Sequence, residues 1–327
     1  MGETNPNERH VGSVPGIINP GVSVVCLSFR RPHLLRRALH SVMQQTQVPD
    51  EIIVVDNASP ESAEISAVVN EFPGIRFIAN PANLGFAGGM NVGLAAARHE
   101  WILITEDDLV LQPDCLHQFV EAEGAADLLG GVLIDNNTGR IESAGGNLRL
   151  RSGYWGQVVL LERFREAPVG DQPIPRTFVQ GCLLFAQARQ FHLHGGFRED
   201  YFVYDEDVEL CARWHARGLR IALIPTARAL HLAPHAGGLS EFTAYHHEKN
   251  LLATFYLYAP AWKLPEVFLR FVAVRFALTI ARRDWKGTQR LWRACRWLFP
   301  RLLNYWSQRN GRWAWPLPDP PKARGAG

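Results

Sequence analysis

Three consecutive acids follow an apolar run in the first half of the chain. The stretch Trp101–Leu109 reads WILITEDDL, so a buried strand is expected to end in Glu106, Asp107 and Asp108. Adjacent carboxylates repel one another unless a cation lies among them. On an extended backbone, Glu106 and Asp108 share one side and Asp107 points away. The triplet is therefore either a site for a hard cation such as Mg²⁺ or a solvated acidic turn before a helix.

A second acidic cluster lies in the other half of the chain. Asp205, Glu206, Asp207 and Glu209 fall within five positions, after an aromatic stretch that begins at Tyr201. One explanation is an exposed helix N-terminus, where the helix dipole favours acids. The alternative is a pocket wall, in which one of these carboxylates acts as a general base toward a hydroxyl group.

Several isolated residues could assist such chemistry. Asp56 ends an apolar run and is either a turn former or an acceptor for a nucleoside N–H or hydroxyl group. Gly85, Gly88 and Gly89 precede a helical pattern, where backbone N–H groups could face an anion or the glycines could simply permit a tight turn. His231 follows a strand-like run and is either structural or a metal ligand near the acidic triplet.

Apolar strands alternate with helical patterns along the first part of the chain. Strands are expected at 22–27, 51–55, 76–78 and 101–104, and helices at about 33–45, 61–71, 85–98 and 113–123. This alternation predicts a parallel sheet wound from βαβ units. Ligands bind beyond the carboxyl ends of such strands, where the polar loops Ser28–Arg31, Asp56–Ser59 and Glu106–Asp108 follow. Beyond residue 114 the alternation loosens, which indicates a mixed, substrate-facing second half.

The composition is that of a globular protein. Of 327 residues, 47% are hydrophobic, which is enough for a real core and excludes global disorder. The five cysteines show no C-x-x-C spacing, so we expect free thiols in a reducing compartment. The first twenty residues lack the apolar core of a signal peptide. We therefore expect a cytoplasmic location, with the chain either free or peripheral on the inner face of the membrane.

Positive charge is concentrated in residues 262–313, which carry a net charge of +10, whereas the whole chain carries +2. The apolar stretch Leu264–Ala281 is interrupted by charged residues, so it suits an amphipathic helix better than a membrane span. Seven of the ten tryptophans lie beyond residue 261, interleaved with arginines. Trp and Arg together suit an anionic membrane surface. A helical hairpin packed on the body or on a second copy is the alternative, and no nucleic-acid-binding module accompanies the charge.

Taken in order, these pieces resemble the inverting glycosyltransferases of family 2. The resemblance covers residues 20–255 approximately, and its nearest branch looks like the rhamnosyl- and galactofuranosyltransferase-like members. It is carried by VVDNAS at 54–59, NLGFAGGMN at 83–91, EDD at 106–108, GCLL at 181–184, DEDVEL at 205–210 and by His231. The resemblance implies the nucleotide-sugar-binding GT-A fold, an α/β fold with a mixed, mainly parallel central sheet, here followed by a C-terminal helical segment.

The resemblance also implies catalytic and metal-binding roles. Asp207, next to Glu206, would be the catalytic base. Glu106, Asp108 and His231 would hold Mg²⁺ or Mn²⁺ on the diphosphate of the donor. Glu106 stands where the family usually has Asp, and its side chain is longer by one methylene group.

The donor implied is a sugar linked to dTDP, UDP or GDP, and the acceptor is a glycan or lipid-linked hydroxyl group in bacterial cell-surface polysaccharide or glycolipid synthesis. Arg30 stands where many family members have Asn. The residues expected to bind the donor are Ser28, Arg30, Asp56, Asn57, Asn83, Gly85, Gly89, Asn91 and Asp107.

The expected organisation has four parts. Residues 1–20 form a flexible lead, 21–260 the GT-A domain, 261–315 a basic, Trp-rich helical tail and 316–327 a disordered C-terminus. A catalytically idle nucleotide-sugar binder or scaffold is the alternative function. A dinucleotide dehydrogenase is less favoured, because no G-x-G-x-x-G follows the first strand. The sequence leaves open whether the chain forms a homo-oligomer.

Overall fold

The computed structural model describes residues 19–148, 161–166, 168, 170–232, 240–282, 285–312 and 316–319. Residues 1–18 of the expected lead and 320–327 of the expected disordered C-terminus lie outside these ranges. The strands are β1 (Asn19–Ser28), β2 (Glu51–Asp56), β3 (Ile75–Ala79), β4 (His99–Glu106), β5 (Leu109–Leu111), β6 (Leu128–Asp135), β7 (Ile141–Ser143), β8 (Gly146–Leu148), β9 (Leu161–Arg163), β10 (Ile174–Arg176), β11 (Leu184–Gln187) and β12 (Ile221–His231). The α-helices are α1 (Pro32–Met43), α2 (Ser62–Asn70), α3 (Gly85–Ala96), α4 (Cys115–Glu121), α5 (Ala188–His194), α6 (Glu206–Ala216), α7 (Glu241–Tyr258), α8 (Leu264–Arg282), α9 (Trp285–Leu298) and α10 (Leu302–Gln308).

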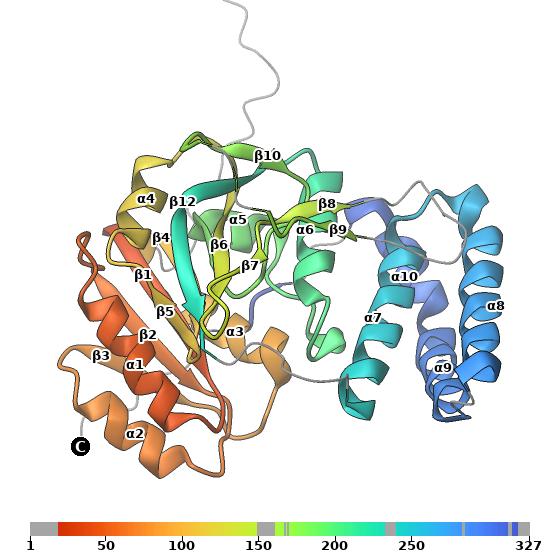
Figure 1. The fold of residues 1–327 in the computed structure, drawn as a ribbon, viewed down its shortest axis with the longest axis horizontal. Coiled ribbons are helices and arrows are strands. Elements are labelled where there is room, and N and C mark those ends of the chain that lie inside the picture. Colours follow the sequence, from red (N-terminus) through yellow and green to blue (C-terminus); the bar gives the residue numbers. More distant parts are fainter. Residues whose placement is uncertain are drawn as a thin grey trace, which may run out of the picture.

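One large mixed sheet forms the centre of the molecule (Figure 1). Its strand order is β10-β12-β6-β11-β4-β1-β2-β3. The β3, β2, β1 and β4 strands pair in parallel, as the βαβ alternation predicts. The β11 strand runs antiparallel to both of its neighbours, β4 and β6, and gives the sheet its mixed character. The predicted α/β class with a mixed, mainly parallel sheet is therefore confirmed.

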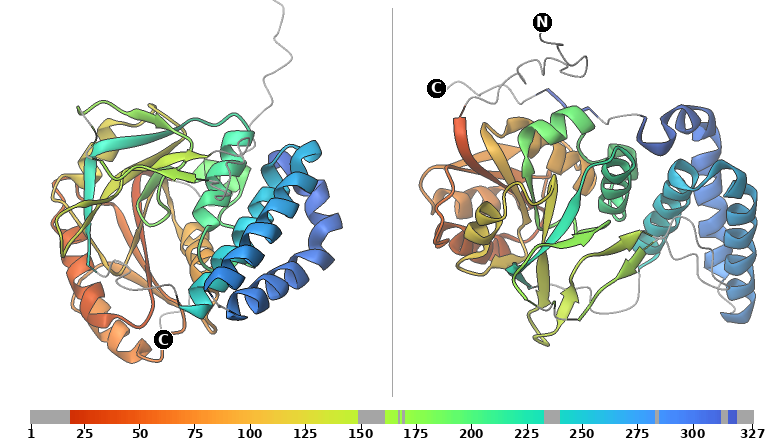
Figure 2. Two further views of the ribbon diagram at one scale, coloured as in Figure 1. Left: turned by 45° about the vertical axis from the view of Figure 1, so that its right-hand side comes forward. Right: turned by 90° about the horizontal axis from the view of Figure 1, so that it is seen from above.

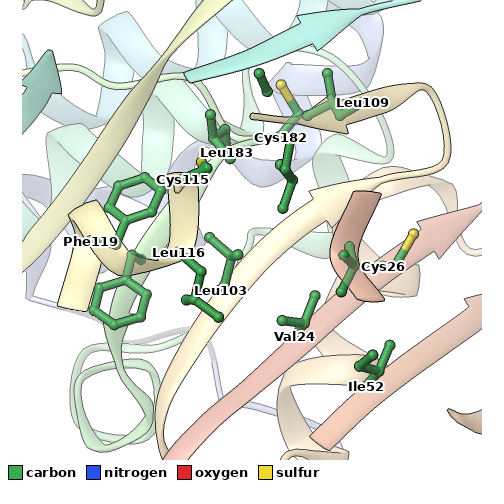
Figure 3. Close-up of a cluster of buried hydrophobic side chains, with 14 of the residues drawn as sticks. Val24, Cys26, Ile52, Leu103, Leu109, Cys115, Leu116, Phe119, Cys182 and Leu183 are labelled. Atoms are coloured by element: carbon green, nitrogen blue, oxygen red, sulfur yellow. The ribbon is translucent and has the colours of Figure 1, made fainter. Parts of the chain in front are cut away.

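Alternate side chains of the central strands face opposite layers of helices, because successive residues in a strand point to opposite faces. Val24 and Cys26 of β1 lie in a core cluster with residues of α1, α2 and α4 (Figure 3). Val25 and Leu27 lie in a second cluster, with residues of α3, α5 and α6. Two apolar layers thus fix the sheet, and the polar loops at its carboxyl edge remain available for a site. All five cysteines are free thiols, as expected.

The long strand β12 connects the two halves of the molecule. It pairs in parallel with β6 and antiparallel with the short strand β5. In the β5 pairing, His231 lies opposite Leu109, the residue that follows the acidic triplet. The register therefore brings a histidine from late in the chain to the end of β4.

The last helices gather at one end of the molecule, beside the sheet-containing body (Figures 1 and 2). Their shared core includes Leu252 and Leu257 of α7, Leu291 and Leu298 of α9, and Tyr305 of α10. The helical hairpin packed on the body, which the sequence left as an alternative, is thus present, and the packed group begins with α7. Among the described residues no helix is long and apolar enough to cross a bilayer.

Candidate functional site

A cavity of about 650 Å³ opens at the carboxyl ends of β1, β2 and β4. Glu106 and Asp108 from the first acidic cluster line it, and so do Asp205, Glu206 and Asp207 from the second. A volume of this size suits a small-molecule ligand. Two acidic clusters that are distant in sequence therefore line one cavity.

Asp107 points away from this cavity, as its place between Glu106 and Asp108 predicts. Its carboxylate accepts hydrogen bonds from the Ser28 hydroxyl at 2.9 Å and from the Phe29 backbone N–H at 2.9 Å. The side chain is fully buried. Asp107 therefore ties the end of β4 to the loop that follows β1, and Ser28 is engaged in the same contact.

Arg31 supplies positive charge to the acidic triplet. Its guanidinium pairs with Asp107 at 2.9 Å and also with Asp108. Arg30, the arginine expected to bind the donor, is exposed and does not line the cavity. The available signal was the Arg-Arg-Pro sequence directly after β1, which did not indicate which arginine turns inward.

His231 lies between two carboxylates. Its Nε2 is 3.3 Å from Asp108 Oδ2, and its Nδ1 is 2.7 Å from Glu142 Oε2. Glu142 belongs to the short strand β7 and also lines the cavity. No sequence motif marked Glu142, because its position depends on the pairing of β7 with β6.

The crowding of acids shifts their protonation. Burial, together with the charge of Asp108, raises the pKa of Glu106 to about 8. Burial acts to raise the pKa of Asp108, but its hydrogen bond to His231 and the charge of Arg31 outweigh burial and lower it. Burial acts to lower the pKa of His231, yet hydrogen bonds with Asp108 and Glu142 raise it to about 10. At neutral pH this end of the cavity therefore holds a protonated Glu106 and a His231 cation.

The second cluster begins helix α6. Asp207 accepts a hydrogen bond from the Gly181 backbone N–H at 3.0 Å and one from the Val208 N–H at 2.8 Å. A Cβ atom at position 181 would lie 2.8 Å from the Asp207 Cβ, so this close approach requires glycine. Gly181, the first residue of the GCLL motif, therefore allows the Asp207 carboxylate to lie beside the segment that leads into β11.

Glu206 and Asp207 differ in their expected charge. Burial, together with the charge of Asp207, raises the pKa of Glu206 well above its ordinary value. One buried oxygen of Glu206 has no hydrogen-bond partner among the described residues. Glu206 therefore holds its proton more tightly than an ordinary glutamate. Both oxygens of Asp207, in contrast, accept backbone hydrogen bonds.

Only part of the expected donor set lines the cavity. Asn57 donates to Asn83 Oδ1 at 3.1 Å and to the Gly85 carbonyl at 2.8 Å, which joins the loop after β2 to the glycine-rich loop. The residues named from the sequence that line the cavity are Asn57, Asn83, Gly85, Glu106, Asp108, Glu206, Asp207 and His231. Those outside the lining are Ser28, Arg30, Asp56, Gly89, Asn91 and Asp107.

Asn91 and Asp56, which do not line the cavity, differ in whether they keep a hydrogen-bond acceptor for a ligand. The amide of Asn91 bonds to the backbone of Phe197 and to Glu199, so its polar atoms hold the body together. Asp56 accepts from the Ser59 N–H through one oxygen at 3.1 Å, while its other buried oxygen has no partner in the described part of the chain. Asp56 therefore retains an acceptor and Asn91 does not.

The expected metal ligands come together only in part. Glu106, Asp108 and His231 line one cavity, and Asp108 contacts His231. Over the described ranges, no three His, Cys, Asp or Glu side chains are arranged as a ready metal site. Asp108 is instead paired with Arg31.

The chain is similar in sequence to known glycosyltransferases. The sequence model described as glycosyl transferase family 2 matches residues 23–147. An N-acetylglucosaminyl-diphospho-decaprenol L-rhamnosyltransferase of Mycobacterium tuberculosis is 24% identical over 266 residues, which are 74% of this chain and 86% of that protein. A galactofuranosyltransferase of the same organism is 32% identical over 91 residues, 27% of this chain and 30% of that protein.

Among solved structures, GalNAc-T7 with UDP, GalNAc and Mn²⁺ superimposes with a TM-score of 0.60 at 16% identity, covering 74% of this chain and 48% of that one. This likeness shows the fold. The sheet and the cavity at its carboxyl edge are arranged as in the GT-A fold. Residues 23–147 of that fold match glycosyl transferase family 2.

The raised pKa of Glu206 predicts a pH-dependent effect of Glu206→Gln. Because the folded state binds this proton more tightly than the unfolded state, stability falls as the pH rises above the ordinary Glu pKa of about 4.3. Gln carries no such proton. The melting temperature of the variant minus that of the parent should therefore be larger at about pH 8 than at about pH 5, by roughly 2 °C or more.

Differential scanning calorimetry at both pH values measures this gain. Glu121→Gln, at an exposed acid on α4, is the control and should show the same difference from the parent at each pH. A Glu206→Gln difference that does not change with pH would contradict the assignment of a protonated Glu206.

Proposed function

We propose that this glycosyltransferase transfers a sugar from a nucleoside-diphosphate donor to a hydroxyl group, with inversion at the anomeric carbon. The observation that carries the proposal is that two acidic clusters, distant in sequence, line one cavity. An inverting transfer needs two functions in one place, namely stabilisation of the leaving diphosphate and removal of the acceptor's proton. The two clusters are suited to one function each.

The donor side of the cavity suits a nucleoside diphosphate. The unpartnered Asp56 oxygen can accept a hydrogen bond from a base N–H or a ribose hydroxyl group. Asn83 and Gly85 line the cavity and are hydrogen-bonded to Asn57, the residue that follows Asp56. Arg31 also lines the cavity and offers a guanidinium, which matches the geometry of phosphate oxygens. The base in a dTDP-, UDP- or GDP-linked sugar would lie toward Asp56 and the diphosphate toward Arg31.

The residues at the end of β4 are of the types that bind a divalent cation, although Asp108 would have to exchange its pairing with Arg31 for the metal. Asp108, His231 and Glu106 carry the oxygen and imidazole ligands that Mg²⁺ or Mn²⁺ accepts. The raised pKa of Glu106, caused mainly by burial and then by Asp108, reflects a group that lacks enough positive charge around it. A bound cation would neutralise charge on the leaving diphosphate. Mn²⁺ in the structure of GalNAc-T7 supports this choice of cofactor.

Asp207 is the better general base of the acid pair. A base must be ionised before it accepts a proton, and the raised pKa of Glu206 opposes its ionisation. Asp207 would take the proton of the attacking hydroxyl group as the bond to the anomeric carbon forms and the bond to the diphosphate breaks. Glu206 would remain a neutral neighbour that reduces repulsion at Asp207.

The acceptor proposed is a glycan or lipid-linked saccharide used in bacterial cell-surface polysaccharide or glycolipid synthesis. The name of the mycobacterial rhamnosyltransferase specifies a decaprenol-linked diphosphosugar, and that protein aligns along 74% of this chain. A lipid-linked acceptor would bring the enzyme to a membrane surface, and the helices beyond residue 260 offer a surface for that contact.

These helices expose apolar side chains on single faces. On α8, Leu269 and Phe276 are 68% and 54% exposed, and their seven-residue spacing places them on one face. On α9, Trp285 and Trp292 are 70% and 61% exposed with the same spacing. Exposed Arg296 lies over the Trp292 ring at 5.3 Å. Exposed aromatic groups with basic charge suit the headgroup region of an anionic bilayer.

The first prediction of this proposal concerns the donor. A panel of dTDP-, UDP- and GDP-sugars with Mn²⁺ or Mg²⁺ should contain one that raises the melting temperature, because a ligand at about 100 times its Kd stabilises a protein by about 2.7 kcal/mol. That donor should also be turned over, with release of nucleoside diphosphate. Stabilisation without any release would favour the idle binder, and chelation of the metal that leaves release unchanged would contradict the proposed cofactor.

The second prediction concerns the base. Asp207→Asn should lower release of nucleoside diphosphate about 10²-fold or more, because general base catalysis contributes roughly that much. Donor-induced stabilisation should remain, since the metal end of the cavity is untouched. Asp127→Asn is the control, because Asp127 pairs with Arg220 and does not line the cavity. Full turnover by Asp207→Asn would exclude Asp207 as the base.

The third prediction concerns the membrane surface. The chain should float with vesicles that contain phosphatidylglycerol and much less with vesicles of phosphatidylcholine alone. Leu269→Ser combined with Phe276→Ser should reduce flotation several-fold, because the apolar contact is lost. Val48→Ser is the control, since Val48 is 70% exposed on the body.

Point substitutions are preferable to removal of the tail, because α9 and α10 share a core with α7. Equal flotation of the parent and the double variant would contradict the membrane surface. A concentration-dependent dimer that the double variant abolishes would identify a second copy of the chain as the partner of this face instead.

A further inference from the structure

The backbone before α6 is strained. Phe202 has φ 68° and ψ −65°, and the Val203 N–H donates to the Tyr201 carbonyl at 2.9 Å, which is the geometry of a γ-turn of the rare, strained kind. Tyr204 and Asp205 follow at φ 66° and 60°. Non-glycine residues with positive φ are uncommon, and three of these four successive residues have it. Such a turn persists only when its surroundings hold it in place.

A single side chain of α7 contacts most of this turn. Asn250 is fully buried. Its Nδ2 lies 3.1 Å from the carbonyl oxygen of Tyr201, 3.0 Å from that of Val203 and 2.6 Å from that of Tyr204. The amide group carries two hydrogens, so the three carbonyl groups share them. Three carbonyl groups that a strained backbone turns inward thus have one common donor.

Lys249 adds a second donor at the start of the turn. Its Nζ lies 3.2 Å from the Asp200 carbonyl oxygen and 3.1 Å from that of Tyr201. These contacts of Lys249 end at Tyr201, whereas Asn250 also reaches the carbonyl groups of Val203 and Tyr204.

The turn also contacts the donor side of the cavity. The Ala87 N–H donates to the Phe202 carbonyl at 3.2 Å, and a Cβ atom on Gly85 would lie 2.1 Å from the same oxygen. The glycine-rich loop at the start of α3 therefore packs directly against the strained backbone. Immediately after the turn, Glu206 and Asp207 begin α6 and line the cavity.

We infer that Asn250 is a positioning residue, which holds the strained turn 201–205 so that Asp207 faces the bound donor. The inference rests on the proposed role of the acid pair. Asn250 does not line the cavity and acts through the turn alone. Residue type is decisive, because an Asp at this position would direct a carboxylate at three carbonyl oxygens and would donate no hydrogen bond.

The test compares Asn250→Ala, Asn250→Asp and Asn250→Ser with the parent. The kcat for release of nucleoside diphosphate from the stabilising nucleotide sugar should fall about 10²-fold for Ala and Asp, because a misplaced catalytic group costs roughly that much. Ser keeps one donor and should lie between these variants and the parent. The KM for the donor and donor-induced stabilisation should change little.

Hydrogen–deuterium exchange supplies a readout that is independent of activity. In the Ala and Asp variants, amides of residues 202–208 should exchange faster, because the local opening free energy of the turn falls. Tyr256→Phe is the matched control on the same helix, since it removes a hydrogen bond to the Leu302 carbonyl and none to the turn. Its kcat and its exchange at residues 202–208 should match the parent.

The outcomes separate the inference from the proposed function. Unchanged exchange at residues 202–208 in the variants would overturn the inference, and so would an equal loss of kcat in Tyr256→Phe. If no nucleotide sugar is turned over by the parent, the proposed function fails, while the exchange measurement still decides whether Asn250 holds the turn. If Asn250→Ala does not fold, Asn250→Ser gives the same comparison with one donor retained.

Discussion

Like charge in a confined space is the constraint on which this site depends. Glu106, Asp108, Glu142, Glu206 and Asp207 all line one cavity, where burial weakens the solvation of each carboxylate. The structure reduces the repulsion in different ways at the two clusters. At the first, Arg31 and the His231 cation supply opposite charge. At the second, burial raises the pKa of Glu206, which disfavours a second negative charge, and backbone N–H groups donate hydrogen bonds to Asp207.

The groups that offset the negative charge are what separate these two chemically similar clusters. In the proposed function, a metal ion and a diphosphate would bind at the first cluster, beside the charges of Arg31 and His231. At the second cluster, backbone N–H groups would support the carboxylate that receives the proton. The two environments thus favour different roles for residues of the same type.

Much of the fold could be predicted from the sequence. The strands up to Glu106 have strong apolar patterns and short loops, so their parallel order and the position of the first acidic cluster at the sheet edge were predictable. The second cluster was recognisable by its density of acids. It does begin helix α6, but Glu206, Asp207 and Glu209 are buried and not exposed, and Glu206 and Asp207 line the cavity. The local sequence therefore identified the acidic residues but did not predict whether they are buried or which groups surround them.

The partners of these acids could not be predicted, because each depends on a distant pairing. Glu142 reaches His231 through the registers of β7 and β12 on β6, and one shifted register would turn either side chain to the other face. Arg31 and Arg30 are adjacent and identical, so only the backbone conformation distinguishes them. Asn250 lies within an ordinary helical pattern, and its importance depends on a turn that no propensity rule predicts.

The order in which the chain is made has a consequence for the pairing of β12 with β5. The acidic triplet is complete once residue 108 has been synthesised, but His231 comes from the last strand of the sheet. A nascent chain therefore carries the triplet with Arg31 as its nearest cation until β12 has been added. Long-range pairing of this kind slows folding, so the final closure of the sheet would be a late event that also completes the charge balance of the site.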